Sequence, residues 1–203
     1  MNISYYNLCK EELNSLKEKK KLLLHSCCAP CSSSVITYLT KYFDITILYY
    51  NPNISPKEEY DKRKKEQIRL INEIEKINNI DIIDCDYDND IYEERIKGYE
   101  NCPERGNRCT ICFNLRLEKT ALLAKELKYD YYCSTLTVSP YKNSKLINEI
   151  GLDLEKKYGV KWLCSDFKKE DGYKKSIELS KKYGLYRQDY CGCKYSVREK
   201  KYD

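Results

Sequence analysis

The sequence predicts one α/β domain, residues 1–203, built on a mainly parallel sheet flanked by helices. Short apolar or β-branched runs alternate with longer segments of helical periodicity from residue 20 to residue 183. No linker rich in Pro, Gly or Ser divides the 203 residues, which suffice for one domain with a substantial core. Strands that alternate with helices are joined by right-handed crossovers, so we expect neighbouring strands to run parallel.

Five segments have the length and composition of strands. The first, KKLLLHS at residues 20–26, is a short apolar run that is typical of a buried strand. The second, DITILYY at residues 44–50, is rich in β-branched and aromatic side chains. The other three are expected at 80–85, within 129–140 and at 160–164.

Five segments show helical periodicity or helix-start signals. Ser55-Pro-Lys-Glu58 is a capping box with proline at the first helical position, which predicts the start of a long helix. The predicted helices are 31–42, 55–78, 109–128, 144–157 and 171–183, and residues 86–108 are expected to form a polar loop around any short helix. The expected inward-facing side chains of the first three helices are Val35, Ile36 and Leu39, then Ile68, Ile71 and Ile74, then Leu115, Leu122 and Leu127.

The chain carries no signal for a membrane or for export. No apolar run approaches the length that crosses a bilayer, and the start, MNISYYNLCKEELNSLKEKKK, lacks the apolar part of a signal peptide. We therefore expect a cytoplasmic protein without a membrane partner. Thiols stay reduced in the cytoplasm, so clustered cysteines there indicate metal binding or catalysis rather than structural disulfides.

Seven of the twelve cysteines fall into three groups, which are Cys27, Cys28 and Cys31, then Cys109 and Cys112, then Cys191 and Cys193. The first group follows the first predicted strand. Ligands of parallel sheets gather at the carboxyl ends of the strands. We therefore expect this group, Asn51-Pro-Asn53 and residues 139–142, which all follow strands, to share one edge of the sheet.

Two of the groups contain cysteines spaced for a metal site. Cys28 and Cys31, like Cys109 and Cys112, are expected at or before the first turn of a helix, where free amides favour thiolates. Two such pairs can supply four sulfurs to one centre, which fits zinc or an iron–sulfur cluster. The adjacent Cys27-Cys28 is unusual for zinc, and seven clustered thiols exceed what one zinc uses, so an iron–sulfur cluster is favoured.

Two other functions remain open on these residues. A thiol–disulfide oxidoreductase would use Cys28 and Cys31 alone, and a zinc-stabilised RNA-binding module would hold zinc in a closed site. Cys191-Gly-Cys193 permits either a redox disulfide or additional metal ligands. The single histidine, His25, is expected to be a hydrogen-bonded core residue, which excludes a multi-histidine metal site.

The positive charge is concentrated near the C-terminus. Residues 168–203 hold 11 Lys or Arg against 6 Asp or Glu, which accounts for the whole net charge of +5. A basic segment on a neutral body suggests a polyanionic partner such as nucleic acid, or only a solvated lysine-rich face.

Five motifs in order resemble one family. From about residue 20 to residue 198 they are LLLHSCCAPCSS, YYNPNISPKEEYDKR, RCTICFNLRLEKTALLAKE, STLTVSPYKN and DFKKEDGYKKSIELSKKYGLYRQDYCGCKYS. Together they resemble the cobalamin-independent epoxyqueuosine reductase family, QueH. The resemblance implies a fold related to the adenine nucleotide alpha-hydrolase-like (HUP) group. The Cys102-Pro-Glu segment has no role in it.

The resemblance implies an iron–sulfur oxidoreductase that completes queuosine at the wobble base of tRNA. It implies a 4Fe-4S cluster with an additional mononuclear metal ion, here expected to be iron, and an external electron donor. The substrate is tRNA that bears epoxyqueuosine. Removing the epoxide oxygen consumes two electrons and two protons and leaves an alkene and water.

The resemblance also suggests a role for individual side chains. Cys27, Cys28, Cys109 and Cys112 are expected to hold the cluster, and Cys31 the second metal. Cys191 and Cys193 would relay electrons or complete the second site. Tyr141 or Tyr190 would donate a proton to the leaving oxygen. The expected substrate contacts are Asn51, Asn53, Glu59, Tyr60, Arg63, Arg116, Lys142, Arg187 and Gln188.

Overall fold

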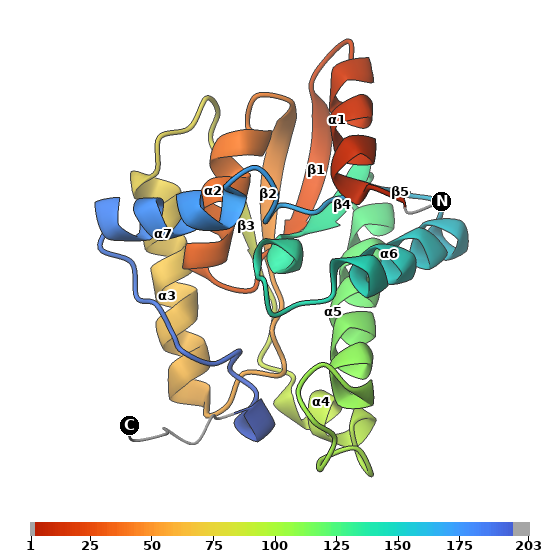
Figure 1. Cartoon of the computed structure of the whole chain (residues 1–203), viewed down its shortest axis with the longest axis vertical. Helices are drawn as coiled ribbons and strands as arrows, with labels where there is room; N and C mark the ends of the chain where they lie inside the picture. The colour runs from red at the N-terminus through yellow and green to blue at the C-terminus, as the bar shows by residue number, and fades with distance from the viewer. Residues whose placement is uncertain (1–2, 197–203) are drawn as a thin grey trace.

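The structure, a computed structural model, describes residues 3–196 and contains one five-stranded parallel sheet (Figure 1). The strands lie in the order β3-β2-β1-β4-β5. They are β1 (Lys20–His25), β2 (Phe43–Tyr49), β3 (Asp81–Asp84), β4 (Tyr131–Ser134) and β5 (Lys161–Trp162). This confirms the predicted α/β class and its parallel sheet, and it is consistent with the HUP-like fold that the resemblance implies.

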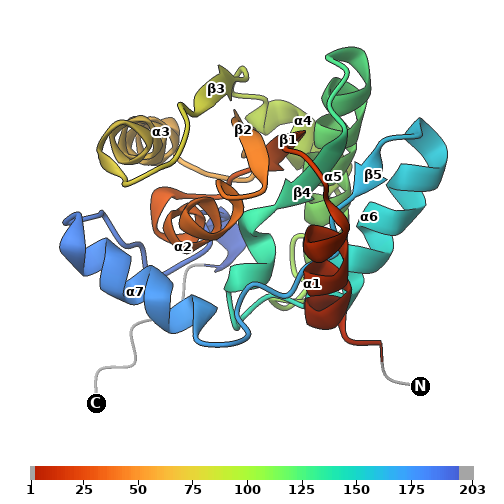
Figure 2. The same ribbon diagram turned by 90° about the horizontal axis from the view of Figure 1, so that it is seen from above.

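Helices cover both faces of the sheet (Figure 2). One face packs against α1, α2 and α3, with α7 on the outer side of α2, and the other face packs against α5 and α6. The helices are α1 (Tyr5–Ser15), α2 (Ala29–Leu39), α3 (Lys57–Glu73), α4 (Asn89–Arg95), α5 (Asn107–Glu126), α6 (Ser144–Tyr158) and α7 (Gly172–Lys182), with 3-10 turns at Thr135–Val138 and Lys194–Ser196. None of these described helices is long and apolar enough to cross a membrane.

The central strand β1 is apolar because it is covered on both faces. Leu22 and Leu24 point into the core beneath α2 and α3, whereas Leu23 points into the core beneath α5 and α6. All three are fully buried. Strands buried on both sides need continuous apolar runs rather than alternation, which is why this segment was recognisable in the sequence.

The strand order places a crevice at the end of β1. The chain adds β2 and β3 on one side of β1 and later adds β4 and β5 on the other. The connections after β1 and β4 therefore leave toward opposite faces of the sheet, which opens a ligand-binding position between their carboxyl ends. In Figure 1 these ends point down, and the C-terminal segment runs down beside α3 to the same end of the molecule.

Several details of the predicted helices are wrong. No capping box forms at Ser55, because Pro56 is the N-cap of α3 and makes no side-chain cap hydrogen bond. The helix ends at Glu73, and Ile68 is 37% exposed. In α5, Leu122 and Leu127 face solvent, since the small Ala121 and Ala124 allow this helix to lie close to the sheet. No helix was predicted from the sequence at the position of α1.

We predict that Gly151→Ala destabilises the protein. Gly151 lies inside α6, and a Cβ there would lie 2.3 Å from two ring carbons of Trp162. Overpacking of this kind costs about 1–3 kcal/mol, which outweighs the gain of roughly 1 kcal/mol from replacing a helical glycine. Urea unfolding measures the difference. Asp153→Ala, on an exposed position of the same helix, should leave the unfolding free energy nearly unchanged. A Gly151→Ala protein as stable as the parent would contradict the packing described here.

Candidate active site

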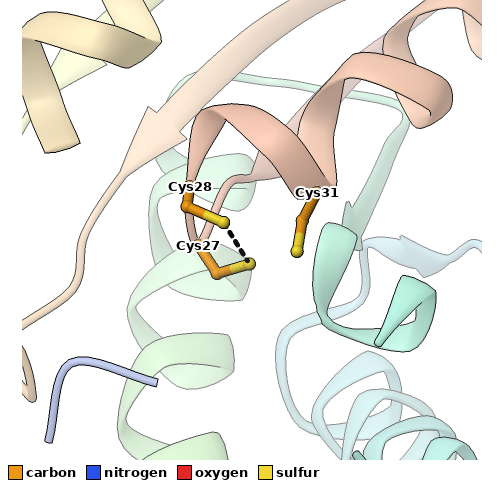
Figure 3. Close-up of side chains that lie close together, drawn as sticks. All are labelled: Cys27, Cys28 and Cys31. Atoms are coloured by element: carbon orange, nitrogen blue, oxygen red, sulfur yellow. Dashed lines mark hydrogen bonds between the residues drawn. The ribbon is translucent and has the colours of Figure 1, made fainter. Parts of the chain in front are cut away.

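Three thiols meet directly after β1. Cys28 is the N-cap of α2, and Pro30 lies in the first turn of that helix. The sulfurs of Cys27 and Cys28 are 3.8 Å apart, and those of Cys27, Cys28 and Cys31 all lie within 4.8 Å of one another (Figure 3). Sulfurs at these separations could hold one metal ion.

The three thiols differ in their pKa, and therefore in how readily each one ionises. Hydrogen bonds from Cys28 and Cys31 lower the pKa of Cys27 well below its usual value, and the guanidinium of Arg116 adds to this effect. Interaction with Cys27 in turn raises the pKa of both Cys28 and Cys31. In the absence of metal, Cys27 is therefore the thiol that ionises first.

Residues that follow β4 hold the first cysteine in place. The backbone N–H of Cys27 donates to Thr135 Oγ1 at 3.1 Å, and the Thr135 hydroxyl donates to Cys27 Sγ at 3.4 Å. Two residues before Cys27, His25 Nδ1 lies 2.9 Å from Ser134 Oγ. Three contacts between two pairs of residues thus join the carboxyl ends of β1 and β4 beside the cysteines.

A buried polar network supports the same loop from the side of α3. The hydroxyls of Ser26 and Ser32 both donate to Gln67 Oε1, at 2.7 and 2.9 Å. Asn51, at the end of β2, donates from Nδ2 to the Ser26 carbonyl oxygen at 2.9 Å. The loop that carries the thiols is therefore fixed before any ligand binds.

The second cysteine group lies on one face of α5. Cys109 Sγ accepts a hydrogen bond from the Arg105 N–H at 3.3 Å. Cys112 is buried and lies in the second turn, which corrects the expectation that it would lie at or before the first. Arg116, four residues on, donates to Cys112 Sγ at 3.9 Å.

The third group packs against the second. Cys193 Sγ is 3.1 Å from the Tyr92 hydroxyl, and both side chains pack with Cys112. Cys191 Sγ is 2.9 Å from Ser196 Oγ. All twelve cysteines lie in the described part of the chain and all are free thiols there, so of the two possibilities for Cys191 and Cys193 the disulfide is not seen.

Position 192, between these cysteines, requires glycine because of its backbone conformation and its close neighbours. Its φ is +98°, and a Cβ would lie 2.8 Å from Ile54 Cγ1 and 3.0 Å from Arg63 Nη1. Its carbonyl oxygen accepts from the Ser55 N–H at 2.9 Å. The C-terminal segment therefore lies directly on the residues that follow β2.

A cavity of about 140 Å³ brings the first and third cysteine groups together. Its lining also contains four cationic side chains and two carboxylates. Burial by itself would lower the pKa of Lys142, but the charges of Cys191, Cys112 and Cys109 outweigh this effect, so the pKa of Lys142 is raised above its usual value. The lining includes Cys27, Cys28, Cys31, Cys191, Arg63, Arg116, Lys142, Arg187, Gln188, Glu104, Asp189, Tyr141 and Tyr190.

The other predicted substrate residues have different positions. Asn53 donates from Nδ2 to the Cys191 carbonyl oxygen at 3.5 Å. Glu59 and Arg63 form a largely buried ion pair of 2.7 Å rather than a surface pair. Tyr60 is buried between the rings of Tyr49 and Tyr87, and it is not among the residues that line the cavity.

Sequence reasoning anticipated some of this site and missed other parts. His25 is a buried, hydrogen-bonded core residue, as expected. Thr135 and Gln67 were not singled out. Thr135 directly follows β4, so the rule that ligands gather at strand ends could have identified it. Nothing in the sequence around Gln67, in the middle of α3, distinguishes it from the neighbouring polar residues.

Comparison with known proteins gives consistent matches. A family model described as epoxyqueuosine reductase QueH matches residues 22–199. Epoxyqueuosine reductase QueH of Streptococcus pyogenes serotype M1 is 42% identical over 199 residues, which cover 95% of this chain and 78% of the relative. The protein of the same name from Staphylococcus epidermidis is 45% identical over 92% and 80% of the two chains. That from Thermotoga maritima is 35% identical over 89% and 92%.

We predict that His25 makes the stability of the metal-free protein fall in mild acid. Burial, followed by the charge of Arg116, lowers the pKa of His25 to about 3, whereas an unfolded histidine titrates near 6.5. Between these values the unfolded chain binds the extra proton. Stability is therefore lost as the pH falls below about 6.5, at up to roughly 1.4 kcal/mol per pH unit.

Urea unfolding of the parent and of His25→Gln between pH 7.5 and pH 5 measures this effect. Carboxylates contribute equally to both proteins, so the difference in slope isolates the histidine. Equal slopes would show that His25 is not neutral in the folded protein.

Proposed function

Because the chain belongs to the epoxyqueuosine reductase QueH family, we propose that it reduces epoxyqueuosine to queuosine in tRNA, the last step of queuosine biosynthesis. The observation that carries the proposal is the family match over residues 22–199, which includes all seven clustered cysteines. A thiol–disulfide oxidoreductase would need only Cys28 and Cys31 and would leave the cysteines of α5 without a purpose.

The thiols fit a metal cofactor by number and by surroundings. Thiolates are the ligands that iron–sulfur clusters use, and cations around the cavity offset their charge. We propose that Cys27, Cys28, Cys109 and Cys112 hold a 4Fe-4S cluster and that Cys31 binds a further iron ion. When bound, such a cluster supplies single electrons that come from an external donor. Cys191 and Cys193 would exchange electrons or complete the second site.

The protons for the reaction would come from tyrosine side chains. Loss of the epoxide oxygen as water takes up two electrons and two protons and leaves a double bond. Tyr141 is 45% exposed, and Tyr190 is half-buried with its hydroxyl 3.4 Å from the Ser55 carbonyl oxygen. Burial, and then Glu59, raise the pKa of Tyr190, so it holds its proton at neutral pH. Both side chains line the cavity and could deliver a proton to the leaving oxygen.

The modified base would be held on the side of the cavity formed by Arg63 and Gln188. Nη2 of Arg63 and Oε1 of Gln188 are buried and have no hydrogen-bond partner within residues 3–196. A donor and an acceptor left without partners suit the polar edge of a base. Asn53 and Glu59 orient this side, whereas Asn51 and Tyr60 support it from within the core.

The surrounding phosphates would lie near the basic C-terminal part. Arg187 is at the cavity itself. Lys168 and Lys194 are partly neutralised, by Asp166 at 2.5 Å and Glu93 at 3.0 Å, whereas Lys169 is exposed. Arg198, Lys200 and Lys201 of the same basic segment lie outside the described residues.

We predict that the protein, purified without oxygen, contains iron and sulfide, and that Cys109→Ser and Cys112→Ser lose most of the iron. Serine cannot replace a thiolate ligand of iron. Metal and sulfide analysis measures the content. Cys85→Ser is the matched control, because Cys85 lies outside the three groups and should not affect iron. Full iron content in both α5 variants would refute the ligand assignment, and zinc without sulfide would favour the RNA-binding alternative.

We predict that the iron-loaded protein, given a strong low-potential reductant, converts epoxyqueuosine in tRNA to queuosine. Mass analysis of the nucleosides would show the loss of one oxygen. Removing a proton donor lowers rates by about 10²–10⁴-fold, so Tyr190→Phe or Tyr141→Phe should slow conversion by this amount. Tyr183→Phe, a similar change in the same C-terminal part, should not. Unchanged epoxide after incubation with protein of intact iron content would refute the function.

A further inference from the structure

Arg116 is a buried cation without a carboxylate partner. It is 4% exposed. Its Nε donates to His25 Nε2 at 3.2 Å, its Nη2 to Asn51 Oδ1 at 2.5 Å and its Nη1 to Cys112 Sγ at 3.9 Å. None of the ion pairs among residues 3–196 includes it. A guanidinium stays charged when buried, so this position is unfavourable unless negative charge lies nearby.

Two other cationic side chains of the cavity, the buried Arg63 and the partly buried Lys142, differ in this respect. Arg63 pairs with Glu59 at 2.7 Å, and Lys142 lies 3.9 Å from a Glu104 carboxylate oxygen. Carboxylates therefore compensate both of them. Within residues 3–196, the groups near Arg116 that can become negatively charged are thiols: Cys112 on its own helix accepts from its Nη1, and Cys27 lines the same cavity.

We propose that Arg116 is a positioning residue whose fixed positive charge is the counter-charge of the metal-bound thiolates. This inference rests on the proposed thiol–metal site. His25 and Asn51 orient the guanidinium without neutralising it, because both partners are uncharged. Metal binding converts neutral thiols into thiolates and releases their protons. A divalent ion with three or four thiolates carries net negative charge, which Arg116 stabilises.

The position of Arg116 argues against direct contact with the substrate. The resemblance suggested that it contacts base or phosphate, but each of its three nitrogens already donates to a partner inside the protein. Arg116 lines the cavity together with Cys27, Cys28 and Cys31. Arg116 would therefore act on the metal site and not on the tRNA.

The test measures binding of Co²⁺ alone to the metal-free, full-length protein, followed by thiolate-to-cobalt absorption. Arg116→Gln keeps hydrogen-bonding groups but removes the charge, and we expect it to weaken Co²⁺ binding by about tenfold or more. Arg116→Lys keeps the charge, and its affinity should stay within a few-fold of the parent. Because the charge is buried, the loss in Arg116→Gln should persist at high salt.

Lys156→Gln is the matched control, since it removes one positive charge from an exposed pair with Asp153. It should bind Co²⁺ like the parent. Parent-like affinity in folded Arg116→Gln would overturn the proposal. So would a tenfold loss in Arg116→Lys, which also decides the question if the glutamine variant does not fold. Cobalt binding needs neither iron nor tRNA, so failure of the reductase activity would be recognised separately.

Discussion

The contact between the carboxyl ends of β1 and β4 is the constraint on which the rest of the site depends. His25 and Ser134 pair in register across these strands, 109 residues apart in the sequence, and their side chains meet at 2.9 Å. Two residues later, Cys27 exchanges hydrogen bonds with Thr135. The chain leaves the two strand ends in opposite directions, so the thiol loop lies in the crevice instead of being covered.

Charge explains the remaining composition of the cavity. Glycine-rich loops at such crevices commonly bind phosphate through backbone amides, but here cysteines take their place. Thiolates carry negative charge of their own, and buried cations face them. Arg63 and Lys142 are partly neutralised by carboxylates, whereas Arg116 is held by neutral groups and directed at sulfur. An arrangement of this kind suits a site that gains negative charge when metal binds.

The C-terminal segment completes the cavity from outside the sheet. Gly192 fits against Ile54 and Arg63, where no side chain has room, and its carbonyl oxygen is bound by the Ser55 N–H. This close approach places Cys191 at the cavity and Cys193 against Cys112. The same segment carries Tyr190 and Gln188, so the proposed proton donor, the proposed base contact and the third cysteine group all depend on one stretch of backbone.

The sequence alone determined the class of fold, the order of strands and helices and the three cysteine groups, because these depend on local patterns. A continuous apolar run such as Leu22 to Leu24 identifies a buried strand without knowledge of its neighbours. Helix boundaries and faces were less certain: Leu122 and Leu127 are good helix formers, and only packing of α5 on the sheet decided that they face solvent.

Tertiary structure alone decided what the polar residues do. Tyr60 and Arg116 belong to motifs that suggest substrate contacts, yet the first lies between two tyrosine rings and the second is enclosed by His25, Asn51 and Cys112. Their surroundings depend on partners far away in the chain, such as Cys85 for Tyr60 and His25 for Arg116, 25 and 91 residues distant, and a local pattern carries no information about such partners.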